Sequence, residues 1–280
     1  MRGHRVYKNV RAVLADVMTL DGKGGLSVSL PVLASYGVKA SSIVTSVIDA
    51  HPRFEMGVRS EEKEELVCRG AAAAKARGCD CDIFYIGAIM SAYEAKVICE
   101  AIDELSTKGT IIVYNPSLGD DGAAYPFVND ALITACREIA ARSDYVTPNV
   151  TESKLLSGLD MGCDEEKTLD ILNAAGVIIT GVRRENSKGV METGYIARIG
   201  HRRVNMLHLL IDGEFYGAGD VFASVFAGEL AGGADAEEAL SGAAEFCLCS
   251  LLSAQDAAPA FEYIINRKER GVNYENYYCG

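Results

Sequence analysis

Short apolar runs alternate along this chain with longer amphipathic stretches, and no other feature of the sequence constrains the fold as strongly. The runs typical of strands cover residues 10–17, 42–48, 82–86, 110–114, 144–147 and 177–182. The stretches typical of helices cover residues 26–36, 61–77, 92–106, 129–142, 218–231, 236–253 and 257–270, and a hairpin is expected over 190–199 and 203–210. This alternation predicts an α/β fold in which a mostly parallel central sheet carries helices on both faces.

The sequence predicts one domain over residues 1–280. A chain of 280 residues is near the upper size of a single hydrophobic core, and it contains no Pro/Ser/Gly-rich linker and no internal repeat. The continuous apolar character of residues 111–113 and 177–179 is typical of strands buried on both faces. Ligands of such sheets bind beyond the carboxyl ends of the strands, so functional residues are expected in the loops that follow the strands.

The charge balance excludes some classes of partner. The chain has 27 Lys and Arg against 39 Asp and Glu, and the net charge of -12 repels nucleic acid and anionic lipid. No apolar run reaches the ~18 residues of a membrane span. Residues 1–9 lack the apolar segment of a secretory signal, and the nine cysteines lack zinc-site spacing. We therefore expect a cytoplasmic protein with reduced thiols that binds neither nucleic acid nor membranes.

The strongest local signal is Gly217-Ala218-Gly219-Asp220, which stands immediately before a long helical stretch. Glycines at this place let the backbone approach a ligand, and the free N–H groups of the first helical turn attract an anion. The carboxylate of Asp220 is placed to take a proton from an attacking hydroxyl. The alternative is that Asp220 only caps the helix while the glycines form a turn. The sequence pattern by itself leaves both interpretations open.

A second signal is Thr147-Pro148-Asn149-Val150-Thr151-Glu152, which follows a short strand and precedes a helical stretch. The oxygen ligands of Asn149 and Glu152 suit Mg²⁺, bound directly or through water. The same spacing also fits a capping box, with Asn149 as N-cap and Glu152 three residues later. Taken alone, the segment favours the capping box.

Together the two segments resemble the ribokinase-like small-molecule kinases and, within them, the pyridoxal kinase family. The stretch 143–152, SDYVTPNVTE, is similar to that family's ADIITPNLTEA, and 115–122, NPSLGDDG, is similar to its DPVMGDNG. Residues 26–33 resemble its first helix, and residues 178–182 resemble a strand on its nucleotide side. The matches follow the family's order from about Asp16 to Gly232. The resemblance implies a ribokinase-like fold and an ATP- and Mg²⁺-dependent kinase that phosphorylates the hydroxymethyl group of pyridoxal or a related B6 vitamer.

The resemblance also implies a role for each matching residue. Asp220 would be the general base, and the N–H groups of Gly217, Ala218 and Gly219 would form the anion hole. Glu152 and Asn115 would contact the metal. The residues expected on the nucleotide side are Asn149, Thr147, Thr180, Gly181, Asn205 and His208. The residues expected to face the pyridine ring are Asp16, Thr45, His51 and Tyr85. Relatives of this kind are commonly homodimers, and some need K⁺.

Several departures from the family pattern keep other functions open. Asn115 stands where the family has an Asp that holds metal and phosphates, and Asp16 stands where it usually has Ser. An acid facing the ring could pair with a protonated nitrogen or an amine. Residues 18–41 leave no room for the β-lid of sugar kinases, and Asp220 differs from the Cys of hydroxymethylpyrimidine kinases. The alternatives are a kinase for another hydroxymethyl or amine compound, hydroxymethylpyrimidine or sugar-like, and a non-catalytic protein that binds a nucleotide or vitamer.

Overall fold

The computed structural model describes residues 9–49, 63–76, 81–211, 215 and 217–255. Its centre is an eight-stranded sheet with the strand order β10-β9-β8-β7-β4-β3-β1-β2. These strands are β1 (Arg11–Thr19), β2 (Lys39–Ile48), β3 (Ile83–Ile86), β4 (Ile111–Tyr114), β7 (Tyr145–Val146), β8 (Gly176–Glu185), β9 (Met191–Ile199) and β10 (Arg202–Leu209). All neighbouring pairs from β2 to β8 are parallel, and β8, β9 and β10 pair antiparallel. The predicted α/β fold with a mostly parallel sheet is confirmed.

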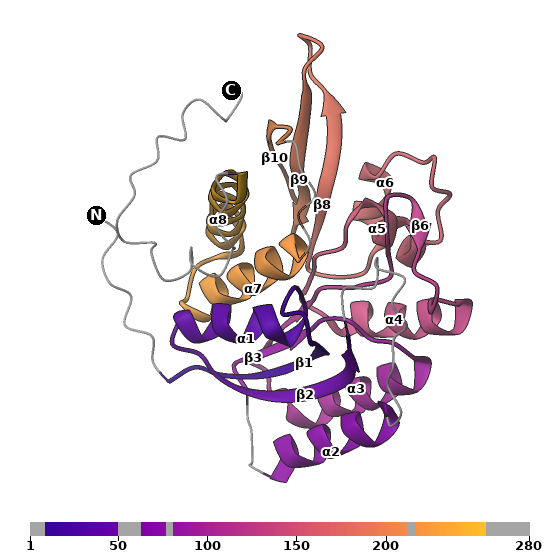
Figure 1. The fold of residues 1–280 in the computed structure, drawn as a ribbon, viewed down its shortest axis with the longest axis vertical. Coiled ribbons are helices and arrows are strands. Elements are labelled where there is room, and N and C mark those ends of the chain that lie inside the picture. Colours follow the sequence, from indigo (N-terminus) through magenta and orange to yellow (C-terminus); the bar gives the residue numbers. More distant parts are fainter. Residues whose placement is uncertain (1–8, 50–62, 77–80, 212–214, 216, 256–280) are drawn as a thin grey trace.

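Helices cover both faces of this sheet (Figure 1). One face carries α1 (Leu26–Ser35), α7 (Ala218–Ala231) and α8 (Ala236–Gln255). The other carries α2 (Lys63–Ala76), α3 (Ala92–Leu105), α4 (Asp130–Arg142), α5 (Val150–Ser157) and α6 (Glu166–Ile171). The side chains of β1 and β3 alternate between the two layers: Leu14 and Tyr85 pack toward α1 and α7, whereas Ala15 and Ile86 pack toward the opposite helices. This period-two alternation is what a strand buried on both faces requires.

The structure differs from the predicted elements mainly at their ends and in the shortest segments. The predicted helix over residues 218–231 is confirmed at both ends, and β2 begins three residues before the predicted residue 42. The hairpin β5 (Gly119–Asp120) and β6 (Ala123–Ala124) and the helix α6 were not predicted, because such short segments show no hydrophobic periodicity. The predicted helix over 257–270 lies outside the described residues, so a single domain over residues 1–280 stays a prediction.

The connection between β1 and β2 is short, as the sequence predicts. Residues 20–38 contain one helix, α1, so no β-lid is inserted at this point. The chain approaches the end of β1 closely at Gly25, which has a φ of 56°. A side chain at Gly25 would collide with the carbonyl of Val17, so only glycine lets the chain pass here. The described helices include none that is long and apolar enough to cross a lipid bilayer.

Candidate active site

A cavity of about 290 Å³ opens at the edge of the sheet where the parallel strands end. Its walls come from the carboxyl ends of β1, β4, β7 and β8, from β9 and β10, and from the helices α5, α7 and α8. Four acidic residues line it, namely Asp16, Asp120, Glu152 and Asp220. Neither Lys nor Arg occurs among the described lining residues. An anion bound here would therefore rely on backbone N–H groups, a helix dipole or a metal ion.

Helix α7 begins at the cavity without a side-chain cap. Its N-cap is Gly217, in the left-handed conformation with a φ of 76°, and a glycine has no side chain to satisfy the N–H groups of the first turn. Asp220 is the third residue of the helix, but its carboxylate turns away from these N–H groups. One oxygen accepts from the backbone N–H of Gly25 at 2.9 Å, and the other accepts from the side-chain amide of Asn115 at 2.9 Å. The interpretation of Asp220 as a simple helix cap is therefore wrong.

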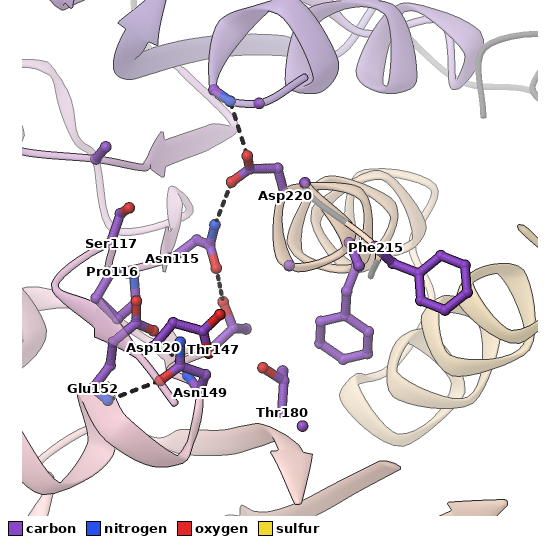
Figure 2. Close-up of a pocket in the computed structure, with 18 of the residues that line it drawn as sticks. Asn115, Pro116, Ser117, Asp120, Thr147, Asn149, Glu152, Thr180, Phe215 and Asp220 are labelled. Atoms are coloured by element: carbon purple, nitrogen blue, oxygen red, sulfur yellow. Dashed lines mark hydrogen bonds between the residues drawn. The ribbon is translucent and has the colours of Figure 1, made fainter. Parts of the chain in front are cut away.

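A chain of side-chain hydrogen bonds fixes the orientation of the Asp220 carboxylate. The hydroxyl of Thr147, at the end of β7, donates to Oδ1 of Asn115 at 3.1 Å. This leaves the amide nitrogen of Asn115 as the donor to Asp220, and a flipped amide would turn its oxygen toward the carboxylate and lose that bond. Figure 2 shows Asn115 between the other two side chains. Asp220 thus has a defined position even though it lies on a different layer from Asn115.

Burial raises the pKa of the acids at the β1 end of the cavity. Removal from water raises the pKa of Asp220, although the bonds from Gly25 and Asn115 oppose this. The pKa of Asp16 lies well above its usual value because of burial and the nearby charge of Asp220. Oδ1 of Asp16 accepts from the N–H groups of Val17 and Ala88, both at 2.8 Å, whereas Oδ2 has no partner within the described part of the chain.

Helix α5 also begins at the cavity, but a capping box closes its N-terminus. Oδ1 of Asn149 accepts from the N–H of Glu152 at 2.9 Å, and Oε2 of Glu152 accepts from the N–H of Asn149 at 2.8 Å. The remaining oxygen of Glu152 accepts from the N–H of Leu118 at 3.1 Å. Burial raises the pKa of this carboxyl to about 8. The capping box that the sequence allowed is therefore present, and both residues still line the cavity.

The oxygen-rich wall between α5 and β4 has the donor chemistry of a magnesium site. Asp120, Asn115 and Glu152 offer only hard carboxylate and amide oxygens, which Mg²⁺ prefers. No cluster of three His, Cys, Asp or Glu side chains with metal-binding geometry occurs in the described ranges. These residues fit a cation that is held by one or two protein oxygens and otherwise by water or phosphate, which is the usual situation of Mg²⁺.

The cavity brings together most of the residues predicted from the sequence. Those that line it are Asp16, Asn115, Thr147, Asn149, Glu152, Thr180, Gly181, His208, Gly217, Ala218, Gly219 and Asp220. His51 lies outside the described residues, and its role stays a prediction.

Three predicted residues do not line the cavity. Asn205 is exposed, because strand alternation turns it to the face of β10 opposite to His208. Thr45 is fully buried, and its hydroxyl donates to the carbonyl of Ala88 at 2.9 Å. Tyr85 is also fully buried below the cavity, where its hydroxyl faces Ser224 and Asn115 without a well-formed hydrogen bond to either. Burial and the nearby charges of Asp220 and Asp16 raise its pKa well above the usual value.

Other lining residues escaped the sequence analysis. They include Gly24, Gly25, Ala88, Asp120, Thr193, Gly194, Tyr195, Phe215, Phe222 and Leu251. Asp120 stands within the segment 115–122, whose resemblance to a metal- and phosphate-holding motif could have identified it. Leu251 comes from α8, and only the tertiary packing of that helix brings it to the cavity.

Comparisons with known proteins show which family the chain resembles. A family model described as phosphomethylpyrimidine kinase matches residues 21–259. The pyridoxal kinase of Bos taurus is 28% identical over 151 residues, which are 46% of this chain and 47% of that protein. The pyridoxine kinase of Bacillus subtilis is 23% identical over 257 residues, or 87% of this chain and 89% of that protein. The chain thus spans about half the length of the bovine relative but most of the bacterial one.

Solved structures show the same fold. The pyridoxal kinase from Leishmania donovani in complex with ADP and pyridoxamine superposes with a TM-score of 0.80 at 16% identity. The match covers 94% of this chain and 97% of that one. At this level of identity the likeness establishes the arrangement of strands and helices.

Proposed function

The chain belongs to the phosphomethylpyrimidine kinase family, and on this premise we propose that it transfers the γ-phosphoryl group of ATP to the hydroxymethyl group of a B6 vitamer. The products are the vitamer 5′-phosphate and ADP. The observation that carries the proposal is the start of α7, where the positioned carboxylate of Asp220 and an uncapped helical turn share one cavity. An acid beside an anion site is the minimum that phosphoryl transfer to an alcohol requires.

In the proposed reaction Asp220 accepts the proton of the acceptor hydroxyl. The oxygen then attacks the γ-phosphorus, the bond to the β,γ-bridging oxygen breaks, and ADP leaves with that electron pair. The raised pKa of Asp220 makes the carboxylate a stronger base than an exposed Asp. Asn115 and the N–H of Gly25 hold the carboxylate in one orientation, so little reorganisation is needed when the hydroxyl arrives.

The uncapped N–H groups of the α7 first turn would stabilise the transferring phosphoryl group. Gly217 in its left-handed conformation ends the preceding loop, and Gly219 has no heavy atom within 4 Å of the place where a Cβ would stand. The backbone is therefore open to a phosphate oxygen at this turn. These N–H groups and the helix dipole supply positive potential without a Lys or Arg.

The wall formed by Asp120, Asn115 and Glu152 would hold Mg²⁺ together with the nucleotide phosphates. When bound, Mg²⁺ neutralises phosphate charge during the transfer. Without that neutralisation the ionised acids of the cavity would repel ATP. Asn115 carries one charge less than an Asp would, but its amide serves Asp220 as a donor, which an ionised Asp could not do. We expect turnover to require Mg²⁺, and parallel assays in K⁺ and Na⁺ buffers test the monovalent ion.

A second candidate acceptor is a hydroxymethyl compound that also carries an amine. The β1 end of the cavity contains two carboxyls, Asp16 and Asp220, and no cationic side chain among the described lining residues. A protonated amine on the acceptor would offset the negative charge of these two carboxyls. Pyridoxamine has such a group, and pyridoxine does not.

A substrate panel tests the proposal. Wild-type protein with MgATP is offered pyridoxal, pyridoxine, pyridoxamine, hydroxymethylpyrimidine and ribose, and ADP release is followed by a coupled assay. The proposal expects ADP release with at least one B6 vitamer and a phosphate ester in the product mass. If ADP were released with the pyrimidine or the sugar and with no B6 vitamer, the proposed acceptor would be wrong and that compound would take its place. Thermal stabilisation by ATP without product from any acceptor would favour the non-catalytic alternative.

The assembly and the cellular location are part of the same proposal. We expect a homodimer in the cytoplasm, as the resemblance and the sequence imply. Light scattering from purified protein measures the mass in solution, and a tagged copy in cell fractions reports the compartment.

A further inference from the structure

His208 has a defined tautomer because of the atom that its ring contacts. Nδ1 lies 2.9 Å from the carbonyl oxygen of Leu209, and a carbonyl oxygen can only accept a hydrogen bond. Nδ1 therefore carries the hydrogen. Burial lowers the pKa of the ring below its usual value, so the imidazole is neutral near pH 7. A neutral imidazole with its hydrogen on Nδ1 has a lone pair on Nε2, which makes Nε2 an obligate acceptor.

This acceptor is unused in the described structure. His208 is 5% exposed and lines the cavity, and no residue of the described ranges gives Nε2 a hydrogen bond. The residue opposite His208 in the β9–β10 ladder is Thr193, which lines the same cavity. A buried ring with one open acceptor is a site for a ligand that donates.

The position of His208 assigns it to one end of the cavity. Four strands separate β1, which carries Asp16, from β9 and its neighbour β10. The start of α7, with Gly219, lies at the same cavity. If phosphate binds at α7 and the acceptor binds beside the carboxyls, the remaining end receives the nucleotide base. The cavity is also lined by Phe215 and Leu251, whose apolar surfaces suit a flat ring.

We propose that His208 selects the base of the nucleotide by accepting a hydrogen bond from an exocyclic amino group at position 6 of a purine. This inference rests on the proposed function and adds the specificity of its nucleotide site. Adenine carries that amino group, whereas hypoxanthine and guanine carry a carbonyl oxygen there. A carbonyl oxygen facing the Nε2 lone pair leaves two acceptors without a donor. An unpaired buried acceptor of this kind reduces affinity roughly tenfold to hundredfold.

The test compares ATP with inosine triphosphate, which differs from ATP in the base at position 6 and in the hydrogen on N1. kcat/KM for each is measured with wild type, His208→Gln and His208→Phe. The glutamine amide can rotate to donate to a carbonyl oxygen, so the preference for ATP should fall at least tenfold in His208→Gln. His208→Phe should lose most of its affinity for ATP and little of its affinity for inosine triphosphate. Asn205→Ala is the matched control, because Asn205 lies on the same strand but outside the cavity.

The outcomes separate this inference from the proposed function. Equal use of both nucleotides by wild type, or an unchanged ratio in both variants, would overturn the role of His208 while leaving the kinase intact. No turnover with either nucleotide would instead refute the function. If the variants fail to fold, ¹⁵N spectra of the histidine rings in wild type decide. The Nε2 resonance of His208 should move upfield with MgADP and not with the inosine diphosphate complex, and no change with MgADP would contradict the inference.

Discussion

Helices α5 and α7 both begin at the cavity and both carry an acid as their third residue, yet the two acids have different roles. In α5 the N-cap is Asn149, and the carboxylate of Glu152 turns back to the backbone of its own helix and to Leu118. In α7 the N-cap is Gly217, and the carboxylate of Asp220 turns outward to Gly25 and Asn115. The identity of the N-cap residue decides whether a helix end is closed or open to a ligand.

The N-termini of α5 and α7 look alike in sequence, but their acids contact different groups. The capping box of α5 satisfies its own N–H groups, which anchors the wall of the cavity. No side chain caps the first turn of α7, and in the proposed reaction its N–H groups bind the phosphate while Asp220 takes the proton. An acid as the third residue of a helix therefore does not indicate one function by itself. Variants at α7 should lose turnover or nucleotide binding, whereas variants at α5 should mainly lose stability.

The largest effect is expected from Asp220→Asn. The substitution keeps the size of the side chain and removes the base, so turnover should fall by about 10²–10⁴-fold. Glu152→Gln at the equivalent position of α5 should reduce kcat less than tenfold when Mg²⁺ is saturating, because Glu152 would help to hold the metal but does not take the proton. Steady-state kinetics on both variants measure the contrast. Equal losses in the two variants would show that the two helix ends are not functionally different.

Gly219→Ala should affect nucleotide binding more than folding. The Cβ would meet no atom within 4 Å, and alanine favours a helix over glycine by about 0.5–1 kcal/mol, so the melting temperature should stay or rise. The methyl group would stand where phosphate approaches the first turn of α7, so KM for MgATP should rise roughly tenfold or more. Thermal unfolding and kinetics on one preparation test this. A drop in stability with an unchanged KM would contradict it.

Asn149→Ala should affect folding more than chemistry. The substitution removes the side-chain cap of α5 and the bond to the carbonyl of Gly119, at a cost of about 1–2 kcal/mol in the free energy of unfolding. Denaturant unfolding measures the loss. The matched substitution in α7 is Gly217→Ala, which removes no side-chain cap. It puts a side chain on a residue in the left-handed conformation, and that side chain would collide with the carbonyl of Lys23. An Asn149→Ala protein as stable as wild type would show that the capping box contributes nothing.

The last prediction concerns the pH dependence that Glu152 contributes to the free energy of unfolding. Its pKa is about 8 in the folded chain and near 4.5 in the unfolded chain, so between these values the folded chain holds a proton that the unfolded chain has lost. Stability from this group should therefore be greatest below pH 4.5 and should fall as pH rises toward 8. The free energy of unfolding of wild type should fall with rising pH more steeply than that of Glu152→Gln, by up to ~1 kcal/mol per pH unit. If the free energies of unfolding of wild type and Glu152→Gln changed equally with pH between pH 5 and 8, the raised pKa of Glu152 would be contradicted.

The sequence predicted the fold and the part of the site that is contiguous in the chain. Gly217 to Asp220 could be predicted to lie at the cavity because the proposed anion site and the proposed base occupy a single helical turn. Asn205 was expected on the nucleotide side but does not line the cavity. Strand alternation puts it and His208 on opposite faces of β10 without saying which face meets the cavity. Thr45 and Tyr85 lie at the right strand ends but too deep, and depth depends on how α7 packs over the sheet.

The role of Glu152 shows another limit of sequence reasoning. The same spacing fits a capping box and a metal site, and the structure contains the capping box beside an oxygen-rich wall. Only the bond from Leu118, thirty-four residues away, reveals how fully the carboxylate is engaged. Leu251 and Phe215 had no sequence signal, because apolar residues line a base site only where tertiary packing brings them.

The most direct test of the account is a calorimetric titration of wild type, Asp220→Asn and Gly219→Ala with a non-hydrolysable ATP analogue and Mg²⁺. In the proposed function the backbone N–H groups of α7 bind the phosphate, and the Asp220 carboxylate accepts the proton of the hydroxyl. The proposal predicts that Asp220→Asn binds the analogue as tightly as wild type or more tightly, because a negative charge is gone, and that Gly219→Ala binds at least tenfold more weakly. Loss of affinity in Asp220→Asn together with wild-type affinity in Gly219→Ala would contradict it.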